Sequence, residues 1–356
     1  MPDHELVGGP LPRAEQAAGS PPVAARGYWE LTWRRLRRDR AALASASVIV
    51  FMFAATFAGG PILERVLGHG PNDLFRYAVD ENLSPAGPFS RVPDVHATVS
   101  GDEPTETTLF VLGADGPLGR DELLRLLYGG RVSLLVALGA TTLALLIGVV
   151  LGTLAALAGG AVDWTVSRLT EMVMAFPVLL LLILLGSTVS DRTDHITLGG
   201  LVNQGVISIV LLIGAFTWFY PARIVRAQLL SLRNRDFVEA ARMTGAGPAR
   251  ILRRELLPHL LPSLLVYGSL IMATNIILEA SITFLGVGVR LPTASWGSLL
   301  SSTWGTLLGS GSAAYLPPRT QTLLTLWPSV AIFVTVLSFN LFGEGLRRAV
   351  EPEGAA

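Results

Sequence analysis

The residues that could perform chemistry are few and poorly placed for catalysis. Cysteine is absent and all 27 basic residues are arginine, so the chain has neither a thiolate nor a lysine amine. A phosphate-binding loop of the GxxxxGK[ST] type needs that lysine and cannot form. The scattered histidines lack the paired spacing of a metal site, and no GxSxG nucleophile turn occurs. We therefore predict no catalytic, metal or cofactor site, and expect any ATP and magnesium to be bound by another polypeptide.

Two polar residues lie inside an apolar segment and are candidates for lining a solute pathway. Glu279 is close to the end of the segment 263–285, and Asn275 precedes it by one helical turn. An ionisable residue at membrane depth is a functional-site hypothesis by default. The alternative interpretation is that Glu279 only reaches the membrane interface or pairs inside a helix bundle.

Composition places the chain in the membrane class. Apolar residues make up 51% of the 356 positions, charged residues only 15%, and the mean hydropathy is +0.52. An ordinary soluble domain is less apolar and more highly charged. The formal net charge is zero, so a basic surface for nucleic acid is not indicated.

The apolar segments predict an all-α integral membrane protein with six transmembrane helices. A stretch of about 20 apolar residues crosses the hydrocarbon core. The segment 41–62 is the first span, and a transmembrane domain over 131–345 contains five more. These five are expected at about 132–158, 169–189, 197–222, 263–285 and 321–343. Gly, Ser, Thr and Pro fill 292–318, which is therefore not a span.

The arginines predict the orientation, because positively charged loops remain on the cytoplasmic side. With a cytoplasmic N-terminus, 18 arginines lie inside and nine outside. The N-terminal tail 1–40 and the C-terminal tail 346–356 are then both cytoplasmic. The segment 63–130 is extracytoplasmic, and within it residues 70–110 form an unusually long polar insertion. We interpret this insertion as disordered, with a cap on the outer mouth or a contact for a binding protein as the alternative.

A long cytoplasmic loop, 223–262, separates two predicted spans. Its apolar spacing predicts a helix that continues to Thr244 and ends at Gly245. Proline at position 248 then predicts the first turn of a second short helix, over 248–257. Pro258 and Pro262 are expected to end that helix before the next span. Two short helices projecting from the membrane could be gripped by a soluble partner.

Ordered motifs along the chain resemble a known family. They are Leu112-Gly113-Ala114-Asp115, Gly119-Arg120-Asp121, Tyr128-Gly129-Gly130-Arg131, Met174-Ala175-Phe176-Pro177, Glu239-Ala240-Ala241-Arg242-Met243-Thr244-Gly245, Glu279-Ala280-Ser281, Ser295-Trp296-Gly297 and Phe339-Asn340-Leu341-Phe342-Gly343-Glu344. The chain resembles the permease subunits of ABC-type importers of the dipeptide, oligopeptide and nickel class. The resemblance covers roughly 30–60 and 112–352, and it is the order of the motifs that makes it specific.

The resemblance implies a type I ABC importer permease fold with a cytoplasmic coupling helix. The residues expected to contact an ATPase are Glu239, Ala240, Ala241, Gly245, Ala246 and Arg250. The implied partners are a second permease subunit, two ATP-binding subunits, an extracytoplasmic solute-binding protein and membrane lipid. The implied location is the bacterial inner membrane, and the implied solute is a peptide or a related small molecule. A homodimeric pore, and the identity of the solute, are left open by the sequence.

Two other classes of function compete with this interpretation. A secondary transporter driven by an ion gradient would carry ionisable residues near the middle of its spans, often with an internal repeat. An intramembrane enzyme would need a nucleophile and base, or a metal cluster, within the spans. The centres of the predicted spans are nearly free of charge, and neither constellation is found in the sequence.

Overall fold

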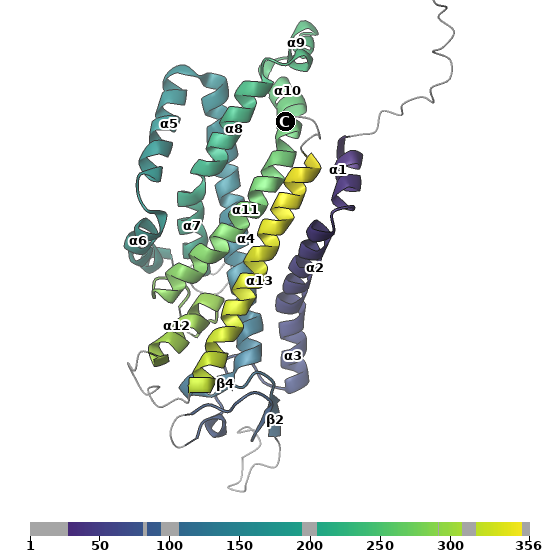
Figure 1. Cartoon of the computed structure of the whole chain (residues 1–356). Helices are drawn as coiled ribbons and strands as arrows, with labels where there is room; N and C mark the ends of the chain where they lie inside the picture. Colours follow the sequence, from purple (N-terminus) through teal and green to yellow (C-terminus); the bar gives the residue numbers. More distant parts are fainter. Residues whose placement is uncertain are drawn as a thin grey trace, which may run out of the picture.

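The computed structural model describes residues 28–80, 84–93, 107–193, 205–290, 292–307 and 318–350. It is a bundle of long helices with a small β-containing subdomain at one end (Figure 1). The α-helices are α1 (Tyr28–Leu36), α2 (Arg40–Ala54), α3 (Gly60–Leu67), α4 (Glu122–Ala158), α5 (Gly160–Met174), α6 (Val178–Thr193), α7 (Val206–Thr217), α8 (Phe219–Leu232), α9 (Asp236–Met243), α10 (Pro248–Ile251), α11 (Leu257–Phe284), α12 (Trp296–Leu307) and α13 (Pro318–Val350). Two π-helical turns, η2 (Ala55–Gly59) and η6 (Leu252–Leu256), join α2 to α3 and α10 to α11.

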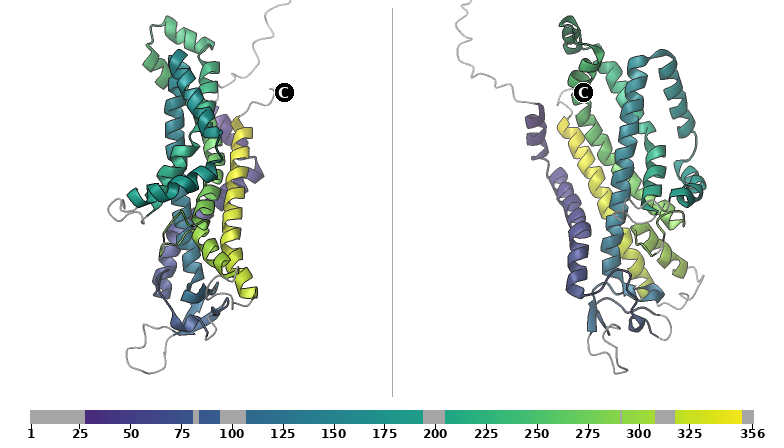
Figure 2. Two further views of the ribbon diagram at one scale, coloured as in Figure 1. Left: turned by 90° about the vertical axis from the view of Figure 1, so that its left-hand side faces the viewer. Right: turned by 180° about the vertical axis from the view of Figure 1, so that it is seen from behind.

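Helix α4 is the central element of the bundle and contacts α5, α7, α8 and α11 (Figure 2). Its buried face carries small residues at every fourth position, namely Ala140, Ala144, Gly148, Gly152 and Ala156. A Cβ atom added at Gly148 would lie 2.6 Å from the Cβ of Pro221, and one at Gly152 only 2.5 Å from the carbonyl oxygen of Ala222. Small residues of this kind allow helix backbones to approach closely within a membrane. The stripe therefore determines how tightly α8 lies against α4.

Four helical segments are long and apolar enough to cross a membrane, and up to six if two bent pairs each count as one span. The first bent pair, α5 and α6, differs from the single helix expected over 169–189. It turns by 85° around Ala175–Pro177, because proline cannot continue the preceding helix. The second pair, α7 and α8, bends by 42° and continues to Leu232, ten residues beyond the predicted end of that span.

Helices α10, η6 and α11 form one continuous helical path from Pro248 to Phe284. The prediction that Pro258 and Pro262 end a short helix is wrong. The π-helical turn shifts the hydrogen-bonding register just before Pro258, which then lies in the first turn of α11, where a missing N–H costs least. Pro262 lies within α11, as is tolerated in membrane helices whose neighbours satisfy the freed backbone groups.

Part of the insertion predicted to be disordered is folded. Strands β1 (Ser90–Pro93) and β2 (Thr107–Phe110) pair antiparallel, with Ser90 opposite Phe110. A second small sheet joins β3 (Ala114–Asp115) to β4 (Arg120–Asp121). Phe75 and Phe110 pack edge to face at a centroid distance of 5.1 Å and are almost fully buried with Ala78, Val92 and Ala114. Residues 81–83 and 94–106 lie outside the described ranges. The aromatic pair packs the described parts of this segment together, and we call residues 68–80, 84–93 and 107–121 the outer subdomain.

The first described helix and the end of the last one lie at the opposite end of the bundle from the strands. Helix α1, the C-terminal end of α13 and helix α9 share one end, while the outer subdomain lies at the other (Figures 1 and 2). Helix α1 falls within the predicted tail 1–40 and packs through Leu36 against Ala349 of α13. The predicted placement of the loop 223–262 on the same side as both tails agrees with this arrangement for the described residues.

The glycine stripe generates a prediction about folding. Gly152→Val should overpack the contact between α4 and α8, because the neighbouring atom is backbone and cannot rotate away. We expect a cost of about 1–3 kcal/mol and a clear fall in the yield of folded protein extracted from membranes. Gly268→Ala is the matched control, since its Cβ would meet only the end of the Leu145 side chain at 3.3 Å. Equal yields of the two variants would contradict the proposed contact.

Candidate functional site

Helix α9 projects from the end of the bundle (Figure 1), and we call it, with the turns on either side (residues 233–247), the knob. The predicted continuous helix up to Thr244 is interrupted, because α8 ends at Leu232 and a turn at Arg233–Arg235 precedes α9. Val238 is fully buried in one cluster with Leu229 of α8 and Leu256 of η6. The projecting part of the predicted loop 223–262 is therefore limited to residues 233–247.

Gly245 ends α9 in the conformation that the sequence predicted. Its φ angle is +81°, in the left-handed region that favours glycine. The N–H of Gly245 donates to the carbonyl of Arg242 at 2.9 Å, and the N–H of Ala246 donates to that of Ala241 at 3.0 Å. These two bonds define a Schellman motif, which fixes the direction of the chain after the helix. Pro248 then begins α10 with Gly247 as its N-cap residue.

The six residues predicted to contact a partner lie together on and after α9 but on different faces. Glu239, Ala240, Gly245 and Arg250 are exposed. Ala241 and Ala246 are half-buried and pack against the cluster that contains Val238. The geometry thus divides the set into an exposed contact face and an anchoring face.

Two neighbouring cavities lie on the side of the bundle formed by α5 and α8, and we call them together the groove. One cavity of about 560 Å³ lies between these two helices, and its lining combines the charged residues Glu171, Arg223 and Arg226 with polar and apolar side chains. A second cavity of about 340 Å³ lies between the α5–α6 bend, α8 and α11. Met174 and Tyr220 line both cavities, so the two lie side by side. Both volumes fall in the range of about 300–1,000 Å³ that is typical of ligand sites.

A bidentate ion pair closes one wall of this groove. Arg226 on α8 donates through Nε and Nη2 to the two carboxylate oxygens of Asp163 on α5, at 2.5 and 2.7 Å. Nearby, Arg168 pairs with Glu171 at 2.8 Å on the exposed surface of α5. The bidentate pair joins the start of α5 to α8 and so maintains the width of the first cavity.

The two polar candidates for the pathway occupy different surroundings. Asn275 is fully buried and lines the second cavity of the groove. Glu279 is fully buried among α11, α4 and the loop before α12, and its Oε1 accepts a hydrogen bond from Thr283 at 3.1 Å. Neither described cavity of the groove includes Glu279 in its lining. Its role in lining a path stays a prediction.

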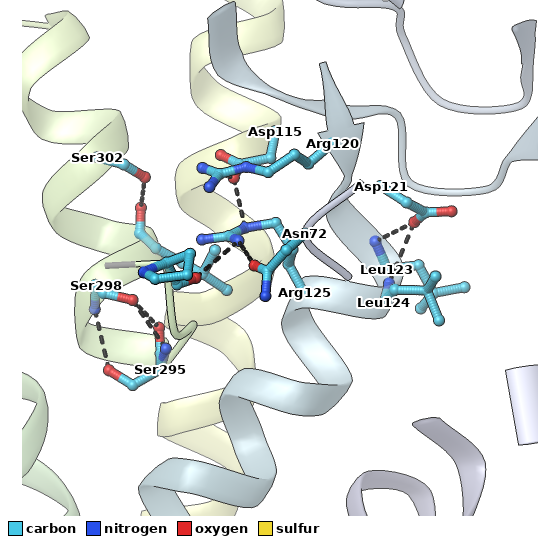
Figure 3. Close-up of polar contacts among 12 residues, drawn as sticks. Asn72, Asp115, Arg120, Asp121, Leu123, Leu124, Arg125, Ser295, Ser298 and Ser302 are labelled. Carbon is cyan, nitrogen blue, oxygen red and sulfur yellow. Dashed lines mark hydrogen bonds and ion pairs between the residues drawn. The ribbon is translucent and has the colours of Figure 1, made fainter. Parts of the chain in front are cut away.

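A buried ion network joins the outer subdomain to the helices (Figure 3). Asp115 accepts from Arg120 at 2.7 Å and pairs with Arg125 of α4 at 2.5 Å. The Arg125 guanidinium also donates to the side chain of Asn72 at 2.9 Å and to the carbonyl of Pro292 at 3.5 Å. Arg125 is 1% exposed. One side chain therefore ties the outer subdomain both to α4 and to the loop that leads into α12.

Comparison with known proteins decides the family. The family model described as the binding-protein-dependent transport system inner membrane component matches residues 148–353. The model described as the N-terminal TM domain of oligopeptide transport permease C matches residues 27–85. The chain belongs to the binding-protein-dependent permease family. It is an inner membrane protein of several apolar helices, and the similarities give no support to a transporter driven by an ion gradient.

Several relatives of this permease match over most of its length. The oligopeptide transport system permease protein OppC of Escherichia coli is 34% identical, with 93% of each chain covered. OppC of Haemophilus influenzae is 31% identical, covering 92% of this chain and 89% of the relative. The dipeptide transport system permease protein DppC of Bacillus subtilis is 30% identical, covering 92% and 86%. A chain of the MetNI methionine ABC transporter, in inward-facing conformations, is similar at a TM-score of 0.45 and 20% identity, covering 64% and 96%.

Sequence reasoning missed two features of the permease. The groove depends on Met174 and Tyr220, and the sequence signal for it was Pro177, which marks the bend between α5 and α6. The hydrogen bonds of Arg125 with Asn72 and Pro292 were also missed, because these two residues are 53 and 167 positions away from it in the sequence. Only the fold brings these groups together.

His69 in the outer subdomain generates a prediction about pH. Burial lowers the pKa of His69, but the hydrogen bond that its Nε2 donates to the Asp121 carboxylate at 3.2 Å and the charge of that carboxylate outweigh burial, so the pKa is raised above 6.5. Because the pKa of His69 is higher in the folded state, its protonation stabilises the folded protein. This contribution is complete at a pH below the unfolded-state pKa of 6.5 and is lost as the pH rises through the folded-state pKa.

We therefore expect the melting temperature of the purified permease to contain a component that falls as pH increases above about 6.5, and His69→Gln should lack it. Thermal unfolding of both proteins across this range measures the effect. The same pH dependence in both proteins would rule out a contribution from the pair of His69 and Asp121.

Proposed function

We propose that the permease forms half of the translocation pore of an ABC importer for peptides and that partner ATPases drive it through α9. The single observation that carries this proposal is the α9 knob, which combines a rigid anchor at Val238 with an exposed face at Glu239 and Ala240. Small exposed residues allow close approach by a partner helix, and the Glu239 carboxylate can accept charge-assisted hydrogen bonds.

The orientation follows the arginines. Arg233, Arg235, Arg242, Arg250, Arg253 and Arg254 are exposed around α9. A concentration of arginine in a short loop favours the cytoplasmic side. We infer that this end of the bundle, with α1 and the end of α13, faces the cytoplasm, and that the outer subdomain faces the other side. Counting each bent helix pair as one span then gives six, as in a type I importer.

The proposed assembly has a second permease subunit, two ATP-binding subunits and an extracytoplasmic solute-binding protein. ATP and magnesium are bound by the ATPase subunits, since this chain has no lysine for a phosphate-binding loop. A peptide substrate is supported by the relatives, whose names describe oligopeptide and dipeptide transport. When the ATPases close, each would push one α9 and rearrange the bundle to which it is anchored.

Charge reversal at the knob tests the coupling. We expect Glu239→Arg to lower both peptide uptake and transport-linked ATP hydrolysis roughly tenfold or more in the reconstituted complex, because a charge-assisted hydrogen bond is worth about 1.5–3 kcal/mol. Glu30→Arg is the matched control, because Glu30 is also exposed but lies on α1, away from α9. Wild-type uptake by Glu239→Arg in correctly inserted complexes would refute the proposal.

The backbone of Gly245 provides an independent test. No atom lies within 4 Å of a Cβ placed there, so a substitution acts only through the φ angle of +81°. Gly245→Val should strain the Schellman motif by about 1 kcal/mol or more and reduce uptake, whereas Gly245→Asn should retain most activity because asparagine tolerates this conformation. Uptake and ATP hydrolysis are measured with both variants, and equal behaviour of the two would show that the cap geometry is irrelevant to coupling.

A further inference from the structure

Asn275 carries an acceptor that nothing described in the fold satisfies. Its Nδ2 donates to Thr141 Oγ1 of α4 at 2.9 Å, and Thr141 in turn donates towards the sulfur of Met272 at 3.8 Å. In this arrangement the amino end of the Asn275 amide faces Thr141. The remaining Oδ1 is buried and accepts no hydrogen bond within the part of the chain that the structure describes. A buried polar atom without a partner requires an explanation, since leaving it so costs about 1–3 kcal/mol.

The cavity beside Asn275 has few other polar groups to offer. Thr217 and Thr274 also line it, but their hydroxyl hydrogens are donated to the carbonyls of Ile213 and Leu270 within their own helices. Most of the remaining lining is aromatic or aliphatic. The interior of the cavity therefore presents hydrogen-bond acceptors, and Tyr220, which lines both cavities, carries a phenolic hydroxyl that can donate. Such a site suits a ligand with N–H groups and a narrow apolar cross-section.

A peptide main chain provides the N–H donors that are missing from the interior of this groove. Each peptide bond other than one before proline provides one N–H donor and one carbonyl acceptor. The N–H complements Asn275 Oδ1, and a carbonyl complements the Tyr220 hydroxyl. Arg223 in the lining of the adjoining cavity supplies a guanidinium that can pair with the carboxylate end of a peptide, whereas Glu171 beside it is already paired with Arg168. This complementarity favours a peptide in transit over an apolar helix of another subunit as the occupant.

We propose that Asn275 Oδ1 accepts a hydrogen bond from a backbone N–H of the transported peptide, so that the second cavity reads the main chain rather than the side chains. This inference rests on the proposed function. It makes Asn275 a specificity-determining residue that distinguishes amides from compounds of the same shape that lack the N–H. A contact with the main chain is compatible with many different side chains, because every peptide bond offers the same group.

The test uses the assembled importer in liposomes, with its second permease, both ATPases and the binding protein. Uptake per ATP hydrolysed is measured for a short peptide and for its ester analogue, in which one N–H is replaced by oxygen, each on fully loaded binding protein. When the ester replaces one particular peptide bond, the wild type should transport the all-amide peptide roughly three- to tenfold better than the ester analogue. This is the usual range for the loss of one hydrogen bond. Asn275→Leu, which keeps the side-chain volume, should transport both compounds equally, with the lower uptake per ATP hydrolysed that the wild type shows for the ester.

Thr141→Val is the matched control, because it removes the internal partner of Asn275 and leaves the acceptor in place. It should keep the preference for the amide even if less protein is recovered. Loss of the preference in Thr141→Val as well as in Asn275→Leu would assign Asn275 to packing between α4 and α11 and overturn the proposal. Equal transport of amide and ester by the wild type at every position would also overturn it, even if Asn275→Leu does not assemble. A wild-type complex without ATP-dependent peptide uptake would instead refute the proposed function.

Discussion

The structure depends on the close contact between α4 and α8, which the glycines of α4 permit. Gly148 and Gly152 leave no room for a side chain against Pro221 and Ala222. Within a membrane, helix association relies on such packing because lipid is as apolar as the helices themselves. Helix α8 carries Tyr220 of the groove near its start and leads into α9 at its end. The same contact therefore positions both the groove wall and α9.

The knob is joined to both walls of the groove through unbroken helices. On one side α8 runs from Tyr220 to the turn before α9, and on the other the continuous path of α10, η6 and α11 leads from Gly247 to Asn275. The buried side chain of Val238 holds these two helices together at the base of α9. A partner that displaces α9 thus acts on two rigid rods whose far parts line the groove, a geometry suited to opening and closing it.

Polar groups are used differently at the two ends of the bundle. At the outer end, Asp115, Arg120 and Arg125 are buried and joined by ion pairs, and they fix the outer subdomain onto α4. At the other end, the arginines around α9 are exposed and available to partners or lipid headgroups. Removing one member of a buried network leaves a charge without compensation, so such a network holds its elements in a single arrangement. The exposed set places no comparable restraint on α9.

The sequence by itself determined the membrane class, the family, the places of most apolar helices and the residues of the knob, including the glycine that ends α9. The membrane class, the apolar helices and the glycine follow from composition, local periodicity and backbone preference, which act over a few residues, whereas the family and the contact residues of the knob were implied by the resemblance of the ordered motifs. Tertiary structure alone decided the bends of two helix pairs, the continuity of α11 through its prolines, the folded outer subdomain and the groove. Each of these depends on contacts between distant segments, such as Asn275 with Thr141 or Arg125 with Pro292, and local sequence contains no measure of such distances.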